Sequence, residues 1–400
     1  MRKNMDRITE TINNWIDHQE IAGCALTVRK ADQLLYQQTF GYANMETRAP
    51  ITMNSIYRMM SMTKVVTAVG VMKLIEDGKL SLDAPLSRYL PEFADSRVAA
   101  DERYAYSPDM DKMRFLAMLK DFDLSSVKTV AAEREITIRD LLSHSSGLEQ
   151  GIVGLLNMMK DQSVNESLSS ETKKYSRYPL DFQPGTATSY SPLAGFDILL
   201  RLCEIISGKK ADEYLWKTVF EPLGMKDSGF RLNKEQSIRL VRVYKRVDNV
   251  LTDVTGTNDD MDGMLHRGPE MISGSGGLYS TIVDYEHFAR MLCNEGQLEG
   301  IRVLKPETVR LMHTEAAKMH LEPEPGMVWG LGVRVRLEPA KSGSSCSEGT
   351  YGWSGAFGTH FFVSPSDQIE AVWCTNRSDA GGSGSPHSKK IENLVFECFR

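Results

Sequence analysis

The chain has 400 residues, of which 41% are hydrophobic and 25% are charged, and its formal net charge is −6. This length is enough for a large core or for two lobes, and both fractions are ordinary for a soluble globular protein. No block of like charges indicates a nucleic-acid-binding surface or a polybasic membrane anchor. No apolar run approaches the ~18 residues that a membrane-spanning helix needs.

The first predicted element is an N-terminal helix. Ile8, Ile12, Trp15 and Ile16 recur at helical spacing, and no continuous apolar stretch follows the basic residues at the start. The segment is therefore predicted to be an amphipathic helix of the fold and not a signal peptide, and a cytoplasmic location is expected.

The six cysteines are scattered along the chain, and no C-x-x-C motif occurs among them. They are Cys24, Cys203, Cys293, Cys346, Cys374 and Cys398. Several lie in apolar surroundings, so buried free thiols are expected, and not a redox or metal site.

Short strand candidates occur near both ends of the chain, and the long middle part has mainly helical patterns. The candidates are Cys24–Val28, Leu34–Phe40, Gly330–Leu337, Thr359–Val363 and Ile369–Cys374, with Lys30–Gln33 as a hairpin turn. The tail Ser388–Phe399 places its apolar residues on one helical face. These patterns predict an α/β lobe built from residues 1–57 and 325–400, with a sheet flanked by terminal helices, and a mainly helical lobe at 58–324.

Two stretches of the middle part have no clear assignment. Asp95–Glu135 is long and mixed, and Asn249–Gly268 is polar and rich in Asp and Gly. Segments of this kind are often lids or binding loops, but plain surface excursions fit the pattern as well.

Several common catalytic signatures are absent. The sequence contains no His-Glu-x-x-His, no G-x-x-x-x-G-K-[ST] and no G-x-S-x-G, and its eight histidines show no ligand spacing. These absences argue against a zinc hydrolase, a P-loop enzyme and an α/β-hydrolase.

The positive signal is a Ser-x-x-Lys spacing. It occurs four times, at Ser61/Lys64, Ser125/Lys128, Ser170/Lys173 and Ser207/Lys210. The second and third copies lie in polar surroundings, and the fourth contains Gly208, which is typical of a helix C-terminus. Only the first copy leads into a long apolar helix, which ends at Gly78.

The first copy allows nucleophilic catalysis. Residues three apart share a helix face, so the Ser61 hydroxyl and the Lys64 amine can come within hydrogen-bond reach. A serine in the first turn also lies where free backbone N–H groups stabilise developing negative charge. A lysine shielded from water can be neutral enough to accept the serine proton. From local context alone, a structural lysine whose amine reaches solvent is an equally good interpretation.

Several longer blocks resemble one family in the same order along the chain. They are GYANMETRAP, SMTK, ITIRDLLSHSSGL, QPGTATSYSPLAGFDILLRLCEIISGK, EPLGMKDSGF, GSGGLYSTIVDYEHFARML and GWSGAFGTHFFVSP. The chain is similar to the serine β-lactamase and penicillin-binding-protein superfamily, and within it to class C β-lactamases, D,D-peptidase-like hydrolases and family VIII carboxylesterases. The resemblance implies a β-lactamase/transpeptidase-like fold with the active site between its lobes.

The family's second motif, Tyr-x-Asn, has two candidate positions. Tyr42-Ala43-Asn44 matches literally, but it precedes the serine and is expected in a turn after a strand, so we interpret it as structural. The collinear block instead contains Tyr190-Ser191-Pro192, which keeps the tyrosine and loses the asparagine. The resemblance implies that Tyr190 acts with Lys64 as the general base.

The third motif, Lys-[Thr/Ser]-Gly, also has two candidates. Lys341-Ser342-Gly343 matches literally but lies in a Ser-rich loop. The family places this motif at the start of a strand with a hairpin return, and Trp353-Ser354-Gly355 has that context, as in family VIII esterases. A neutral aromatic residue in place of the lysine favours an uncharged substrate portion.

The resemblance implies a serine hydrolase that forms an acyl-enzyme, most simply a carboxylesterase for small or medium acyl esters. Ser61 is the expected nucleophile, and the N–H groups of Ser61 and Ala356 form the expected oxyanion hole. The expected substrate-binding residues are Trp353, Ser354 and Gly355. A β-lactamase, a D-amino-acid peptidase or amidase and a transesterase use the same site, and a non-catalytic binding protein of this fold is a further alternative.

The expected partner is therefore a small-molecule ester, with a β-lactam or an amide as alternatives. Neither a nucleic acid nor a membrane is an expected partner, and no metal or organic cofactor is expected. The sequence contains no indication of the oligomeric state.

Overall fold

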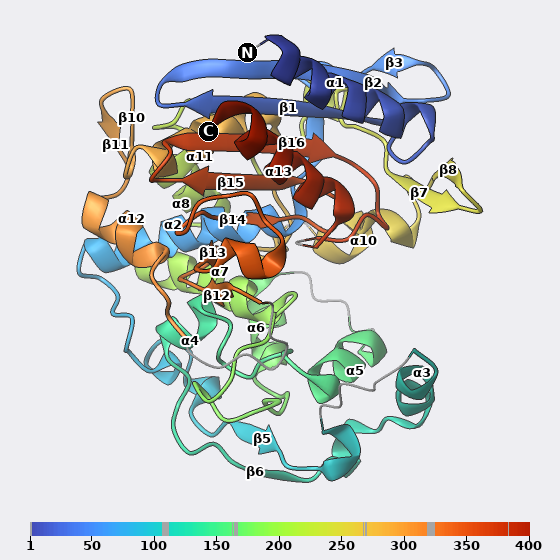
Figure 1. Cartoon of the computed structure of the whole chain (residues 1–400). Helices are drawn as coiled ribbons and strands as arrows, with labels where there is room; N and C mark the ends of the chain where they lie inside the picture. The colour runs from blue at the N-terminus through green and yellow to red at the C-terminus, as the bar shows by residue number, and fades with distance from the viewer. Residues whose placement is uncertain are drawn as a thin grey trace.

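A computed structural model describes residues 2–105, 112–161, 163, 167–266, 268, 270–317, 325–382 and 384–400. Its largest element is an antiparallel sheet with the strand order β12-β13-β14-β15-β16-β1-β2-β3 (Figure 1). Along the β1–β16 pair Cys24 lies opposite Thr375 and Lys30 opposite Ile369, so strands from the two chain ends are hydrogen-bonded neighbours. This confirms the predicted sheet. The strands are β1 (Gly23–Lys30), β2 (Gln33–Asn44), β3 (Ala49–Pro50), β12 (Met327–Trp329), β13 (Arg334–Arg336), β14 (Tyr351–Ser354), β15 (His360–Ser364) and β16 (Ile369–Thr375).

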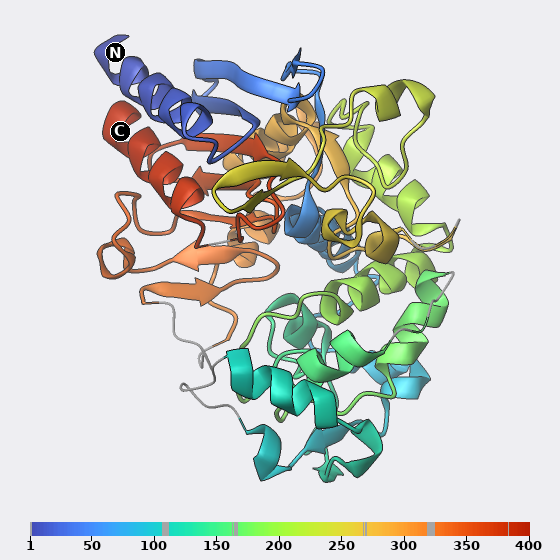
Figure 2. The same ribbon diagram turned by 90° about the vertical axis from the view of Figure 1, so that its right-hand side faces the viewer.

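The terminal helices α1 (Arg2–Asp17) and α13 (Pro386–Phe399) lie side by side on one face of this sheet (Figure 2). Apolar spacing in the sequence places a stripe on each helix, and both stripes are buried against the strands. The shared cluster includes Ile8, Ile12, Trp15, Leu26, Trp373, Ile391 and Leu394. The predicted terminal helices are therefore confirmed.

The opposite face of the sheet is covered by α11 (Ile282–Cys293), which packs against β1, β15 and β16. Next to it, α2 (Thr63–Glu76) packs against α7 (Ala194–Ser207). Every residue of α2 from Thr63 to Met72 is buried, so the helix is apolar all round and not amphipathic. One contiguous hydrophobic cluster runs from this face of the sheet through α2 and α11 into the helical part.

The remaining elements form the middle part of the chain (Figure 1). Its helices are α3 (Lys112–Asp121), α4 (Ile138–Leu142), α5 (Ile152–Lys160), α6 (Leu168–Tyr175), α8 (Ala211–Leu215), α9 (Lys234–Ile238), α10 (Asp262–Leu265) and α12 (Pro306–Met312). Its strand pairs are β4–β9 (Ile56–Arg58 with Tyr279–Thr281), β5–β6 (Arg97–Ala99 with Thr129–Ala131), β7–β8 (Tyr244–Val247 with Val250–Asp253) and β10–β11 (Gln297–Leu298 with Ile301–Arg302).

The two stretches without a clear assignment contain several of these elements. Asp95–Glu135 holds β5, α3 and β6, and residues 106–111 within it lie outside the described part. Asn249–Gly268 holds β8 and α10, and residue 267 lies outside the described part.

Three local predictions are wrong. Gly330–Leu337 is not one strand, because a turn that contains Gly332 with φ +81° separates β12 from β13. Tyr42-Ala43-Asn44 lies inside the end of β2 and not in a turn. Trp353 and Ser354 lie at the end of β14 and not at the start of a strand. In each case the sequence prediction followed neighbouring turn-forming residues. The strand ends are instead set by the pairing of each strand with its neighbours in the sheet.

All six cysteines are free thiols, as predicted. Across the described residues, no helix combines the length and the hydrophobicity needed to span a bilayer.

Candidate active site

Ser61 lies in a short 3-10 turn, η1 (Met60–Met62), between β4 and α2. Met60 has φ of +50°, a conformation that is costly for a residue with a side chain and persists only where its surroundings enforce it. The turn is held at both ends, because Met59 N–H donates to Leu278 O at 2.9 Å and Thr63 Oγ1 donates to Met60 O at 2.6 Å. This geometry presents the Ser61 hydroxyl at the N-terminus of α2.

Lys64 is buried in the first turn of α2, with 1% of its surface exposed. Its amine donates to the Pro192 carbonyl at 2.7 Å and to the Ser275 carbonyl at 3.0 Å. The lysines of the three other Ser-x-x-Lys copies, Lys128, Lys173 and Lys210, are all exposed. Burial therefore separates Lys64 from the lysines that match the same tetrapeptide.

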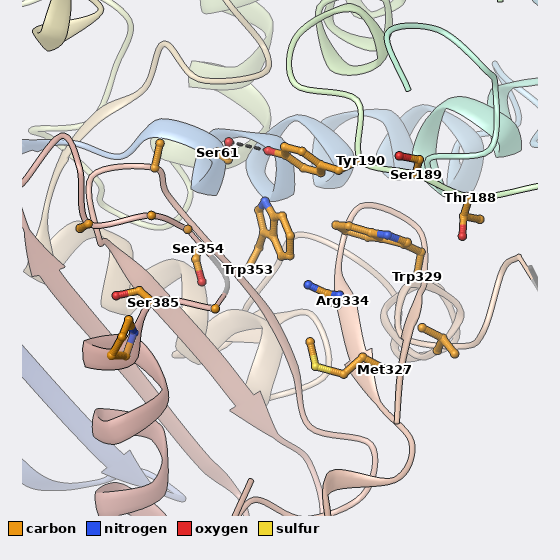
Figure 3. A pocket seen from close by; sticks show the side chains of 17 residues that line it. Ser61, Thr188, Ser189, Tyr190, Met327, Trp329, Arg334, Trp353, Ser354 and Ser385 are labelled. Carbon is orange, nitrogen blue, oxygen red and sulfur yellow. Dashed lines mark hydrogen bonds between the residues drawn. The ribbon is translucent and has the colours of Figure 1, made fainter. Parts of the chain in front are cut away.

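Tyr190 brings its hydroxyl to Ser61, and its O–H donates to Ser61 Oγ at 2.6 Å (Figure 3). Lys64 Nζ lies 5.0 Å from the centre of the Tyr190 ring. The loop is anchored at the next residue, because Ser191 N–H donates to His144 Nδ1 at 3.1 Å. Burial lowers the pKa of His144 well below its ordinary value, so the imidazole is neutral and can accept this bond.

A buried carboxylate, Asp197 on α7, holds one of the two acceptors of the lysine. Its Oδ1 accepts hydrogen bonds from the Ser273 hydroxyl at 2.8 Å and from Ser275 N–H at 3.0 Å. Burial raises the pKa of Asp197 to about 6, while the bond from Ser273 and the charge of Lys64 oppose this rise. Asp197 therefore fixes the Ser275 backbone, whose carbonyl accepts from Lys64.

The turn after β14 lies directly against η1. A Cβ on Gly355 would lie 2.4 Å from Met59 O and 3.0 Å from Met60 Cβ, so a larger residue cannot fit without moving η1. The close approach places Ala356 and Ser61 in the wall of the same cavity, as a shared oxyanion hole would require.

The two candidates for the third motif have different surroundings. Ser354 is buried, and its hydroxyl shares a hydrogen bond with His360 Nδ1 at 2.7 Å, while His360 Nε2 lies 3.3 Å from Glu392 Oε2. Lys341 of the literal match has a side chain that is 59% exposed, and it pairs with Glu338 at 2.7 Å. The Trp353-Ser354-Gly355 segment, and not the literal match, is therefore the one that lies beside Ser61.

These elements enclose a cavity of about 520 Å³ (Figure 3). Its wall includes five residues of the predicted site, namely Ser61, Tyr190, Trp353, Ser354 and Ala356. Lys64 lies beneath this wall, and Gly355 contributes through its close contact with η1.

Two wall residues, Trp329 and Arg334, were not predicted from the sequence. They face each other across the β12–β13 hairpin. The Trp329 ring lies 4.6 Å from the Trp353 ring, and Arg334 Cζ lies 5.6 Å from the centre of each indole. The wrong assignment of this region to one strand hid the pair, because residues on a single strand do not face each other across a turn.

A family model described as Beta-lactamase matches residues 5–394. The chain belongs to the Beta-lactamase family.

Three known proteins are similar to this Beta-lactamase family member over nearly its whole length. Protein Rv1367c of Mycobacterium tuberculosis is 29% identical, and the match covers 99% of this chain and 98% of that protein. Esterase EstB of Burkholderia gladioli is 24% identical, with 98% and 94% covered. The solved structure of EstCE1, described as a hydrolase with promiscuous acyltransferase activity, superimposes with a TM-score of 0.79 at 22% identity, covering 99% of this chain and 98% of that one. The chain therefore has the β-lactamase/transpeptidase-like fold.

The segment of this Beta-lactamase family member that lies beside Ser61 carries a neutral indole at Trp353. In the described part of the chain, no group of three or more His, Cys, Asp or Glu side chains is placed to hold a metal ion.

Proposed function

We propose that this hydrolase of the Beta-lactamase family is a carboxylesterase that forms an acyl-enzyme on Ser61. The observation that carries the proposal is the 2.6 Å hydrogen bond between Tyr190 Oη and Ser61 Oγ, beside the buried amine of Lys64. Covalent catalysis usually requires a nucleophile in contact with a group that can take its proton. That group in turn lies next to a third polar group.

In the proposed reaction Ser61 Oγ attacks the ester carbonyl while Tyr190 and Lys64 jointly accept and relay its proton. The N–H groups of Ser61 and Ala356 stabilise the oxyanion, and loss of one such donor typically costs ~10²–10³ in turnover. The alcohol leaves with the proton from Tyr190, and water then releases the acid. The Lys64 amine, 5.0 Å from the centre of the Tyr190 ring, assists Tyr190 in this proton transfer.

An uncharged acyl or alcohol portion of the substrate is favoured by the aromatic part of the wall, which also contains Arg334. Tyr190, Trp329 and Trp353 form a cluster of aromatic rings whose centres lie 4.6–6.0 Å apart. Met327 and Val328 add apolar surface to the same wall. Aromatic and aliphatic walls bind uncharged acyl and alcohol groups well. The names of EstB and EstCE1 describe an esterase and a hydrolase, which agrees with this choice.

The proposal is tested by initial rates on p-nitrophenyl acetate, butyrate and octanoate and on a chromogenic cephalosporin. Wild type should cleave the esters, Ser61→Ala should lose this activity, and the cephalosporin should be cleaved slowly. Ser189→Ala, which changes another serine of the cavity wall, is the matched control and should retain activity.

Ester cleavage that survives in Ser61→Ala would remove Ser61 as the nucleophile. Faster turnover of the cephalosporin than of any ester would make the protein a β-lactamase. Butyl ester formed from added butanol would identify acyl transfer as a second outcome of the same acyl-enzyme.

A further inference from the structure

The indole N–H of Trp353 has no hydrogen-bond acceptor in the part of the chain that the structure describes. Trp353 is 7% exposed, and its Nε1 is buried with no partner among the described residues. A buried N–H without an acceptor is costly, and each one in a native structure requires an explanation. Trp353 also lines the cavity next to Ser61, so a bound substrate could supply the acceptor.

The position of this N–H relative to the reacting groups is informative. Figure 3 shows the nitrogen of Trp353 at the end of the ring that points toward Ser61 and the Tyr190 hydroxyl. The Trp353 ring lies 5.2 Å from the Tyr190 ring and 4.6 Å from the Trp329 ring, which fix its orientation from two sides. The N–H therefore lies near the place where a scissile ester bond meets Ser61.

The surroundings also make this N–H a better donor. Arg334 Cζ lies 5.6 Å from the centre of the Trp353 ring, and a cation over an indole face draws on its electron density. An indole nitrogen can only donate, so Trp353 cannot serve as a base, but it can stabilise negative charge that develops on an oxygen.

We propose that Trp353 is a catalytic residue whose N–H donates to the alcohol oxygen of the ester as the carbon–oxygen bond breaks. The inference rests on the proposed function, because it requires an acyl-enzyme on Ser61. In this step the carbonyl carbon keeps its new bond to Ser61 Oγ, and the electron pair of the broken bond stays on the alcohol oxygen. That oxygen takes the proton from Tyr190, and the Trp353 N–H keeps its hydrogen throughout.

This role predicts the substrate class. An alkyl alcohol leaves with a large negative charge on its oxygen in the transition state, whereas p-nitrophenol delocalises that charge into its ring. A donor aimed at the leaving oxygen therefore matters most for esters of alkyl alcohols, and the natural substrate is assigned to that class.

The test compares ethyl butyrate with p-nitrophenyl butyrate, which give the same acyl-enzyme and differ only in the leaving group. Trp353→Phe removes the N–H and keeps an aromatic ring. We expect kcat/KM for ethyl butyrate to fall by ~10², the usual effect of losing one donor to a developing charge. For p-nitrophenyl butyrate the fall should be less than ~10-fold, so the ratio of the two substrates changes.

Trp329→Phe is the matched control, because it alters the neighbouring indole of the same cluster and should change both rates by one common factor. Replacement of Trp353 by the benzothienyl analogue of tryptophan keeps the bicyclic ring and substitutes sulfur for N–H, which covers the case of a poorly folded Phe variant. An unchanged ratio in both Trp353 variants would overturn the inference. Activity that persists in Ser61→Ala would instead overturn the proposed function.

Discussion

Two buried groups of charged side chains, one beside the cavity and one against the large sheet, are built in different ways. At the cavity, the Lys64 amine donates to two backbone carbonyls, and Asp197 accepts from Ser273 and Ser275. Lys64 and Asp197 are each 1% exposed, yet both have hydrogen-bond partners. A buried charge is tolerated when it is hydrogen-bonded in this way.

Against the sheet, Glu370 of β16 and Glu286 of α11 are buried next to Arg29 of β1. Arg29 Nε forms an ion pair with Glu286, but neither carboxylate oxygen of Glu370 accepts a hydrogen bond from any described residue. Burial, followed by the neighbouring Glu286 charge, raises the pKa of Glu370 well above its ordinary value. The Glu370 carboxylate thus lacks donors among the described residues, whereas the Asp197 carboxylate accepts two hydrogen bonds.

The comparison indicates that the charged group at the cavity contributes to catalysis, whereas the charged group against the sheet affects only stability. The group at the cavity already has hydrogen-bond partners in the folded protein and lies next to Tyr190 and Ser61. Its removal should therefore change catalysis. None of Arg29, Glu286 and Glu370 lines the cavity, so titration of this group should change the free energy of unfolding and leave the reaction unaffected.

The largest effect is expected for Lys64→Met. The variant removes the charge beside Tyr190 and should lower kcat/KM on p-nitrophenyl butyrate by ~10²–10⁴, the typical contribution of acid–base assistance. Steady-state kinetics together with a thermal melt would separate this loss from unfolding. Lys341→Met, in the literal copy of the third motif, is the control and should leave kcat/KM unchanged. Full activity in Lys64→Met would make Lys64 structural. Both buried groups would then affect stability and not catalysis.

A smaller loss is expected for Gly355→Ala, which disturbs the cavity group without changing any charge. The new Cβ would meet Thr359 Oγ1, Met59 O and Met60 Cβ at 2.2, 2.4 and 3.0 Å, so η1 and Ser61 must shift. Misplacement by about 1 Å typically costs ~10²-fold in rate. Gly263→Ala is the control, because no atom of the described residues lies within 4 Å of a Cβ at this position. Unchanged kinetics in Gly355→Ala would mean that the turn after β14 does not set the position of Ser61.

The smallest effect, confined to stability, is expected for Glu370→Gln. A raised carboxyl pKa stabilises the folded state fully below the pKa of the unfolded chain, about 4.3. This stabilisation is lost as the pH rises through the folded pKa, at up to ~1.4 kcal/mol per pH unit. Glutamine cannot ionise, so the variant should lose this slope and keep wild-type kcat/KM.

Urea unfolding at a series of pH values from 5 to 9 measures the effect on the Glu370 variant. Glu299→Gln, whose carboxylate is 72% exposed beside Arg290, is the control and should follow wild type. A wild-type slope in Glu370→Gln would show that the group against the sheet is not the source of the pH dependence.

The sequence by itself determined the outline of the fold and the identity of the central residues. Apolar stripes in the terminal segments and β-rich runs at both ends were enough to predict the sheet and its two covering helices, because these periodicities are local. The apolar helix after Ser61 distinguished Lys64 from three other Ser-x-x-Lys lysines, and collinear blocks distinguished Tyr190 from Tyr42.

Only the tertiary structure decided what surrounds these residues. The acceptors of Lys64 are backbone carbonyls 128 and 211 positions away, and carbonyl groups carry no residue signature in a sequence. Trp329 and Arg334 enter the cavity wall through a hairpin turn that the pattern of Gly330–Leu337 did not show. That the N–H of Trp353 finds no acceptor among the described residues is likewise a property of three-dimensional packing, because whether a donor is satisfied depends on every neighbour that the fold brings to it.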